Sequence, residues 1–493
     1  MVLLLSDWAQ DPGSIAVAFS SLGFLLHLNL IPFEIDESTP LLASAFVLFW
    51  IGLATIFVRF LELSVFSAIL NTFLAVSSFT GALATSMTMY RVFFHRLRDF
   101  HGPLGAKISR FFVMSDISKS GLRYHVELEK MHQKYGDFVR VAMADYMPRV
   151  EAKADEFIKG LRERTGKIID ITQWSLFYTF DVMGLIAFSK DYGQLNNGKE
   201  HFAITGMHDQ MELVGVFSAV PWLMHLLQSI PGIKGSFEIF LKYCNQQVDE
   251  RKAEWKQDEE RKPNDVVSWL IKSMEDGGPS APGPVALYED GRLTIVAGSD
   301  TTGATLANAF YFLTTHPEVY QRLQKEVDQV KASGGDASQI PYLDAIITET
   351  LRLKPVVPSG LKRLTPPEGL VVDEVWIPGR TIVITPQHVL QRDERNFERP
   401  LEFLPERWLE EGKHMHKDER AWFPFSIGLY SCVGKHLGLM QLRFALHRVA
   451  TEFDVSFAPQ EDGRKFFEDA KDTFTMTCPS LQLVLNKRQL AQS

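Results

Sequence analysis

The sequence predicts a mainly α-helical protein with a small β-sheet, preceded by N-terminal transmembrane helices. Three observations support this fold class. Residues 1–89 contain three long apolar stretches and no lysine, most later segments repeat apolar residues at helical spacing, and only short segments alternate as strands do. We therefore divide the chain into a membrane anchor, residues 1–89, with one to three transmembrane helices, and a helical domain, residues 90–493.

Each apolar stretch of the anchor approaches the length that an α-helix needs to cross a bilayer. The stretches are Ser14–Ile31, Leu41–Val58 and Leu63–Thr85. A basic cluster follows them, formed by Arg91, Arg96, Arg98, Lys107 and Arg110. Such a cluster after a membrane helix favours the cytoplasmic side, so we expect the helical domain to face the cytosol. The alternative is that these are buried helices of a soluble domain, which would have a surface almost without basic side chains.

The overall composition excludes one class of partner and one kind of scaffold. The net charge is −9, whereas binding to a nucleic-acid backbone needs a concentrated basic face, so we expect no nucleic-acid partner. Cys244, Cys432 and Cys478 are too few and too widely spaced for a disulfide framework. They are typical of a reduced, cytosol-facing protein that keeps one cysteine for chemistry.

The elements of the helical domain follow from apolar spacing. We expect helices at Leu122–Lys134, Tyr146–Glu163, Ile171–Phe188, Phe237–Trp255, Leu293–Thr315, Glu318–Lys331 and Tyr342–Lys354. Asp137–Val141 alternates like a short strand, and Val371–Val383 alternates around a turn, which predicts the small sheet. The charge run Asp258–Asp265 indicates a solvated face or loop, and Gly277–Pro284 indicates a connector.

The strongest chemical signal is the segment FSIGLYSCVG at residues 425–434. Gly428 and Gly434 let the backbone turn tightly and approach a flat ligand around Cys432. The apolar spacing that follows predicts a helix starting near Cys432, where backbone N–H groups and the helix dipole favour a thiolate. A thiolate is a soft iron ligand that promotes O–O cleavage at heme iron. The alternative is a buried structural cysteine.

A second motif lies inside the long apolar helix, where Ala297 and Gly298 precede Ser299, Asp300, Thr301 and Thr302. An acid and hydroxyls inside such a helix are costly unless they serve a purpose. Gly298 leaves room on one face, and we expect Thr301 to bond back to a carbonyl and open a local bulge where dioxygen and water can sit. Asp300 and Thr301 would then pass protons. The alternative is a hydroxyl-rich helix that only packs against its neighbours.

Two further motifs carry charge. Glu349 and Arg352 are three residues apart and can pair on one helix face, and Arg407 lies in the segment Pro405–Trp408. Taken alone, the first would be an ordinary surface pair and the second an ordinary turn. Together, Glu349, Arg352 and Arg407 can form a buried ionic network that fixes geometry behind a cofactor.

These four motifs, in this order and behind a membrane anchor, resemble the cytochrome P450 family over about residues 90–490. The segment Pro358–Gly369 looks like fungal microsomal members. The resemblance implies a cytochrome P450 fold around heme b, with Cys432 as the iron ligand. It also implies a monooxygenase in the endoplasmic reticulum membrane that takes electrons from NADPH through an NADPH–cytochrome P450 reductase. Its substrate would be a lipophilic small molecule, a secondary metabolite such as a terpenoid.

The resemblance also carries roles to individual residues. Arg363 is expected to contact a heme propionate, Phe425 to shield the sulfur of Cys432, and Glu349, Arg352 and Arg407 to fix the scaffold on the cysteine side. Two departures matter. Tyr430 stands where the family usually has a basic residue, so it can offer a propionate only a neutral hydrogen bond. Between the strand Asp137–Val141 and the next helix, the chain lacks the segment that covers the heme in the family.

The missing segment keeps alternatives open. The chain can be an active monooxygenase, a heme-thiolate isomerase or dehydratase that needs no dioxygen, or a shortened, catalytically impaired membrane protein. Asp300 and Thr301 argue against the second, because proton delivery to bound oxygen would then be unnecessary. The missing segment supports the third.

Overall fold

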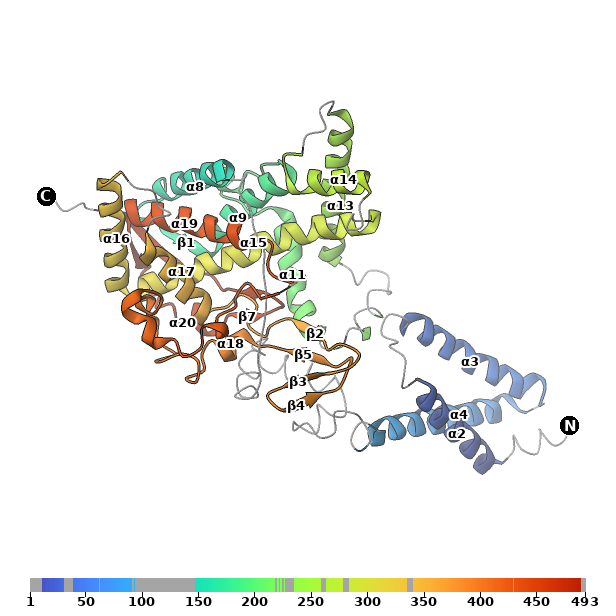
Figure 1. Cartoon of the computed structure of the whole chain (residues 1–493). Coiled ribbons are helices and arrows are strands. Elements are labelled where there is room, and N and C mark those ends of the chain that lie inside the picture. The colour runs from blue at the N-terminus through green and yellow to red at the C-terminus, as the bar shows by residue number, and fades with distance from the viewer. Residues whose placement is uncertain are drawn as a thin grey trace. The chain divides into compact units, whose positions relative to one another are not determined.

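The computed structural model describes residues 11–30, 39–61, 63–90, 93, 147–217, 220, 222–223, 226, 235–258, 263–277, 283–334, 340–428 and 430–488. The chain divides into two compact units, which are described separately. The first contains the N-terminal helices and the second contains most of the helical domain (Figure 1).

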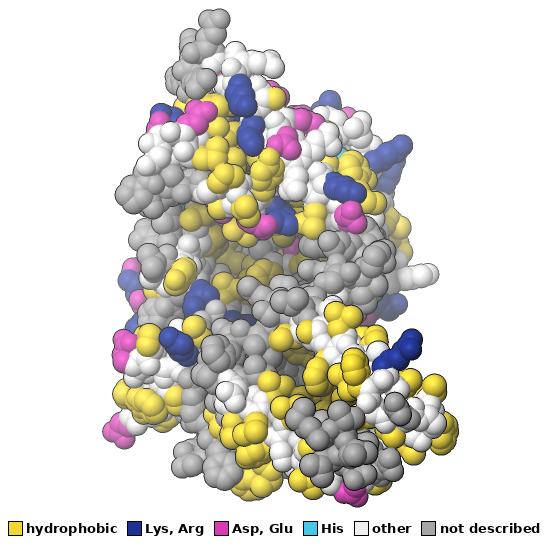
Figure 2. All heavy atoms as spheres, turned by 90° about the vertical axis from the view of Figure 1, so that its right-hand side faces the viewer, with side chains coloured by type: hydrophobic (Ala, Val, Ile, Leu, Met, Phe, Trp, Pro, Cys, Tyr) yellow, Lys and Arg dark blue, Asp and Glu magenta, His cyan; other side chains and the backbone are white. Residues whose placement is uncertain are grey.

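Three long helices form the N-terminal part: α2 (Pro12–Leu30), α3 (Thr39–Arg59) and α4 (Val65–Met89). All three are long and apolar enough to cross a membrane, and they coincide with the three predicted stretches. Large apolar side chains point outward from each of them, among them Phe24, Phe49 and Phe73, which are at least half exposed. Figure 2 shows such hydrophobic side chains gathered on the surface. An outer face of this kind suits lipid better than water.

Helices α2 and α4 pack closely against each other. A side chain at Gly23 would clash with the carbonyl of Phe79, so the glycine lets the two backbones touch. The ring of His27 is 7% exposed, and its Nδ1 lies 2.7 Å from the hydroxyl of Ser86. A close backbone approach and side-chain polar contacts therefore hold this pair together.

The second unit is mainly helical, as predicted. Its helices are α8 (Met147–Arg162), α9 (Ile171–Phe188), α10 (Gln194–Asn197), α11 (Phe202–Phe217), α13 (Gly235–Gln257), α14 (Val266–Asp276), α15 (Pro284–Thr315), α16 (Pro317–Ala332), α17 (Pro341–Leu353), α18 (Gln387–Leu390), α19 (Lys435–Glu452) and α20 (Arg464–Glu468). Short 3₁₀ turns cover Pro405–Trp408, Glu410–Met415 and Glu419–Ala421.

The strands are short and pair in small antiparallel sheets. They are β1 (Ile168–Asp170), β2 (Lys362–Leu364), β3 (Leu370–Val372), β4 (Val375–Ile377), β5 (Ile382–Ile384), β6 (Phe453–Phe457), β7 (Lys471–Asp472), β8 (Met476–Thr477) and β9 (Gln482–Lys487). The largest sheet has the order β1-β9-β6, with Ile168 opposite Val484, and the others are the pairs β2–β5, β3–β4 and β7–β8. The β3–β4 hairpin and β5 overlap the predicted Val371–Val383 region.

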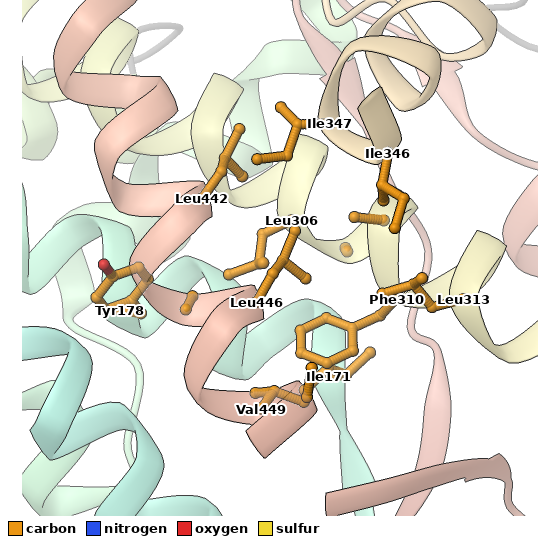
Figure 3. Close-up of a cluster of buried hydrophobic side chains, with 14 of the residues drawn as sticks. Ile171, Tyr178, Leu306, Phe310, Leu313, Ile346, Ile347, Leu442, Leu446 and Val449 are labelled. Carbon is orange, nitrogen blue, oxygen red and sulfur yellow. The ribbon is translucent and has the colours of Figure 1, made fainter. Parts of the chain in front are cut away.

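The core of the second unit forms around α15. Side chains from α9, α15, α17 and α19 meet there, as Figure 3 shows for Tyr178, Phe310, Ile346 and Leu446, which are all at most 1% exposed. Burying large apolar side chains supplies the main stabilisation of such a fold. The core thereby fixes the relative positions of α15 and α19, the two helices that carry the strongest motifs.

Most predicted helices are confirmed within one or two residues, and the differences have local causes. Helix α15 begins at Pro284 rather than at Leu293, because proline suits the first helical turn and Gly291 packs against Val248 of α13. Helix α14 was missed. Asp265 is its buried N-cap, bonded to the backbone of Ser268 in a capping box, and is not part of a solvated charge run.

Some predictions lie outside the described residues. These are the helix Leu122–Lys134, the strand Asp137–Val141, the basic cluster that follows the anchor and most of the connector Gly277–Pro284.

Candidate active site

Cys432 lies in the loop that leads into α19. Its backbone N–H donates to the carbonyl of Phe425 at 2.9 Å, which closes the loop. Gly428, inside the loop, has φ +79°, a conformation that strongly favours glycine. Gly434 is the N-cap residue of α19 and Lys435 its first residue, so Cys432 lies just before a helix N-terminus, as predicted.

The thiol of Cys432 is open to a ligand. Its side chain is exposed, whereas Cys244 is buried and Cys478 is partly buried, so Cys432 is not a buried structural cysteine. Desolvation by the surrounding protein raises the pKa of the Cys432 thiol, while the backbone N–H groups of Gly434 and Lys435 and the charge of Lys435 act to lower it. A coordinated metal ion deprotonates a thiol outright, and these N–H groups are placed to stabilise the resulting thiolate.

Arg363 and Tyr430 lie side by side. Arg363, on β2, is partly buried, and its guanidinium carbon is 5.3 Å from the centre of the Tyr430 ring. Tyr430 is 70% exposed. A guanidinium next to a phenol hydroxyl offers a carboxylate both a charge-assisted and a neutral hydrogen bond. The structure therefore brings together the two residues that the sequence assigned to heme propionates.

The motif on α15 is only partly as predicted. The hydroxyl of Thr301 donates to the carbonyl of Ala297 at 2.6 Å, as expected. The expected bulge is absent, because α15 is a continuous α-helix from Pro284 to Thr315. The room beside Gly298 is filled by Met183 of α9, whose side chain would clash with an added Cβ. Gly298 thus serves close helix packing rather than opening a groove.

Asp300 is 3% exposed and is paired on both carboxylate oxygens. One oxygen accepts a hydrogen bond from the hydroxyl of Thr475, and the other lies 3.3 Å from Nε2 of His208. Sequence reasoning missed His208 and Thr475, because each is far from Asp300 along the chain and neither stands in a recognisable motif. Only the packing of α11 and of the β7–β8 turn against α15 identifies them.

Glu349, Arg352 and Arg407 form one buried network, and all three are 0% exposed. Arg352 donates to both oxygens of Glu349 at 2.8 Å, and Arg407 Nε donates to Glu349 Oε1 at 3.4 Å. Trp408 Nε1 and the backbone N–H of Leu404 also donate to this carboxylate, at 2.8 and 3.0 Å. The alternatives of a surface pair and an ordinary turn are therefore excluded.

The two guanidinium groups of this network use their remaining donors on backbone carbonyls. Arg352 reaches the carbonyls of Gln391, Pro400 and Glu402, and Arg407 reaches those of Glu398 and Arg399. The network therefore ties α17 to the segment from 391 to 407. A buried charge with every donor satisfied restricts the backbone to one arrangement.

The residues around Cys432 fit heme b. Tyr430 and Val433, on either side of the thiol, are each 70% exposed and offer apolar surface to a flat cofactor. Helix α15 comes close to the start of α19, since a Cβ at Gly438 would lie 3.4 Å from the hydroxyl of Thr302. A thiolate for iron, a cation for a propionate and flanking apolar surface are the donor set that heme requires. Among the described residues, no group of three or more His, Cys, Asp or Glu offers another metal site.

Comparison with known families gives a match over most of this unit. The profile of the family described as Cytochrome P450 matches residues 138–485. Cytochrome P450 monooxygenase FCK2 of Fusarium pseudograminearum is 32% identical, with 97% of this chain and 98% of the relative covered. Tryprostatin B 6-hydroxylase of Aspergillus fumigatus is 29% identical, with 84% of this chain and 85% of the relative covered.

The fold has a counterpart among solved structures. The crystal structure of the cytochrome P450DA heme domain superposes with a TM-score of 0.58 at 17% identity, covering 70% of this chain and 74% of that one. The alignment with the Fusarium relative spans 553 positions, more than the 493 residues of this chain. Part of that relative therefore has no counterpart here.

Proposed function

Because this chain belongs to the cytochrome P450 family and is one of its monooxygenases, we propose that it inserts one oxygen atom from O2 into a lipophilic secondary metabolite, such as a terpenoid. Electrons come from NADPH through an NADPH–cytochrome P450 reductase. The chain sits in the endoplasmic reticulum membrane, with residues 90–493 as a heme-thiolate catalytic domain facing the cytosol. The observation that carries the proposal is the exposed Cys432 thiol beneath the N-terminus of α19.

Two further observations support the finer parts of the proposal. The three N-terminal helices have the length and apolar surface of membrane spans, which favours a substrate that partitions into lipid. One similar protein is named for the 6-hydroxylation of tryprostatin B, a single small molecule. Both observations support a membrane-anchored enzyme that acts on an apolar metabolite.

The residues of this chain take distinct parts in the reaction. When bound, heme supplies the iron at which dioxygen is activated. Cys432 Sγ would bind the heme iron, and the N–H groups of Gly434 and Lys435, which act to lower the thiol pKa, would help to stabilise the bound thiolate. Phe425, whose carbonyl accepts the N–H of Cys432, would keep water from the sulfur. Gly428 and Gly434 shape the loop.

Arg363 and Tyr430 hold the propionates, and Glu349, Arg352 and Arg407 keep the backbone behind the cysteine loop in place. On α15, Asp300 and Thr301 would deliver protons to the reacting site. The hydrogen bond from Thr301 to Ala297 must open or be shared when the hydroxyl turns toward another acceptor.

The first test is the difference spectrum of the reduced, carbon-monoxide-bound protein in membranes. The wild type should give the red-shifted Soret band of thiolate-ligated heme, and Cys432→Ser should lose it. Cys244→Ala is the matched control, because it removes a buried thiol elsewhere and should keep the band. A wild-type protein that is folded but has no band would reject the proposal.

The same spectrum decides between this function and a shortened, impaired protein, since an impaired chain would hold little heme. Incorporation of ¹⁸O from ¹⁸O2 into product, dependent on NADPH and the reductase, then separates a monooxygenase from a heme-thiolate isomerase or dehydratase. Product formed without label would favour the latter.

A further inference from the structure

A histidine lies between two carboxylates, one buried and one near the surface. His208 Nε2 is 3.3 Å from Oδ1 of Asp300, and His208 Nδ1 is 3.9 Å from Oε1 of Glu200. The three side chains are 5%, 23% and 31% exposed, in the order Asp300, His208, Glu200. The series therefore runs from the interior of α15 through α11 toward solvent.

The contacts on either side of His208 have different strengths. The contact with Asp300 is within hydrogen-bond distance. His208 Nδ1 lies 3.9 Å from Glu200 Oε1, a separation that one water or a small rotation of the side chain can bridge. Glu200 is itself held by the hydroxyl of Thr205, which donates at 2.8 Å. Asp300 is held by the hydroxyl of Thr475, which donates to its second oxygen.

An imidazole between two carboxylates has the chemistry of a proton carrier. Histidine is the side chain whose ordinary pKa allows both charge states near neutral pH, and its two ring nitrogens can each bind a proton. Asp300 needs such a source, because its side chain is buried and each proton passed to Thr301 must be replaced.

We propose that His208 is a proton-relay residue that recharges Asp300 from Glu200 and solvent. A proton from solvent binds at Nδ1 by way of Glu200 and the Nε2 proton moves to Oδ1 of Asp300, which leaves the ring protonated on Nδ1. The starting tautomer returns when Nδ1 loses its proton to solvent and Nε2 takes one up as the side chain rotates away from Asp300. This inference rests on the proposed oxygenation, since it supplies the proton that Asp300 and Thr301 pass on. His208 acts through Asp300 and is thus a positioning residue in the reaction.

The alternative is that His208 has only a structural role, in which its contact with Asp300 connects α11 to α15. The structure offers a matched control for it, because Lys471 of β7 forms an ion pair with Glu212, also on α11. Glu212→Gln removes a tie between α11 and its neighbours without touching Asp300. His208→Gln keeps a donor toward Asp300 but cannot carry a proton between two sites.

The experiment compares His208→Gln, Glu212→Gln and wild type as full-length protein in membranes with reductase. NADPH-dependent O2 consumption without added substrate is measured in H2O and D2O, and amide hydrogen exchange of α11 is measured in parallel. The relay predicts that His208→Gln slows O2 consumption about tenfold or more and raises the solvent isotope effect, with α11 protection retained. Glu212→Gln weakens an exposed ion pair of α11, and whatever α11 protection it loses should leave the rate unchanged. A rate that follows α11 protection in both variants overturns the relay.

A second measurement does not depend on turnover. It uses the ¹⁵N chemical shifts of His208 in full-length protein with ¹⁵N-labelled histidine, assigned by the signals that His208→Gln loses. Glu200→Gln should change the chemical shift of Nδ1, and Asp300→Asn should change that of Nε2. If Glu200→Gln leaves the chemical shift of His208 Nδ1 unchanged, Glu200 is not coupled to the ring, and the relay is rejected. If the wild type neither binds heme nor consumes O2, the proposed function fails. The ¹⁵N chemical shifts of His208 then still test whether its ring is coupled to both carboxylates.

Discussion

The buried carboxylate of Glu349 gives the sharpest stability prediction. Glu349 is 0% exposed and accepts hydrogen bonds from Arg352, Arg407, Trp408 and the backbone of Leu404. Burial lowers the pKa of the Arg407 guanidinium, and the charge of Glu349 is the largest effect that opposes this. The carboxylate is thus the counter-charge for two buried guanidinium groups.

Glu349→Gln keeps the shape of the side chain and removes the charge. An amide offers one oxygen, so it cannot accept both hydrogen bonds of Arg352, and its NH2 group faces a donor. Removing one partner of a buried ion pair costs about 3–5 kcal/mol. Since each 1.4 kcal/mol is a factor of about ten, the ratio of folded to unfolded protein should fall by two to four orders of magnitude.

The assay is denaturant unfolding of the purified full-length protein, with heme content per chain measured on the same samples. Glu410→Gln is the matched control, because its side chain is 87% exposed and pairs only with the nearby Lys413 among the described contacts. That variant should stay within about 0.5 kcal/mol of wild type. If Glu349→Gln loses no more than this control, the network does not need its negative charge, and our reasoning is wrong.

Three further predictions concern packing and pH. Gly298→Ala should lose about 1–3 kcal/mol of unfolding free energy, because its Cβ would overlap Met183, and the same substitution in a Met183→Ala background should cost much less if that contact is the cause. Burial lowers the pKa of Lys354 to about 7, so the unfolded chain binds more protons between pH 7 and 10.5, and stability should rise with pH across that window. Lys354→Met should flatten this rise in thermal unfolding curves, and an equally steep curve would contradict the assignment. Gly23→Leu should separate α2 from the backbone around Phe79, seen as faster protease cleavage between the N-terminal helices in membranes, whereas unchanged cleavage would mean that the close approach is unnecessary.

The sequence by itself determined which residues could do chemistry. The glycines around Cys432, the acid and hydroxyl of Asp300 and Thr301, and the pair Glu349 and Arg352 stand in short local patterns. Such patterns work because loop conformation and helix position depend on neighbours in the chain. The three N-terminal helices were likewise determined by local composition, since a bilayer-length apolar run needs no tertiary partner to form a helix.

Only the tertiary structure decided how those residues are used. It placed Arg407 on Glu349, filled the room beside Gly298 with Met183, and kept α15 straight where a bulge was expected. It also placed His208 and Thr475 on the two oxygens of Asp300 from segments distant in sequence. The physical reason is that a buried polar group must find partners wherever the packed elements supply them, and those partners are set by how helices and turns pack, which no local pattern encodes.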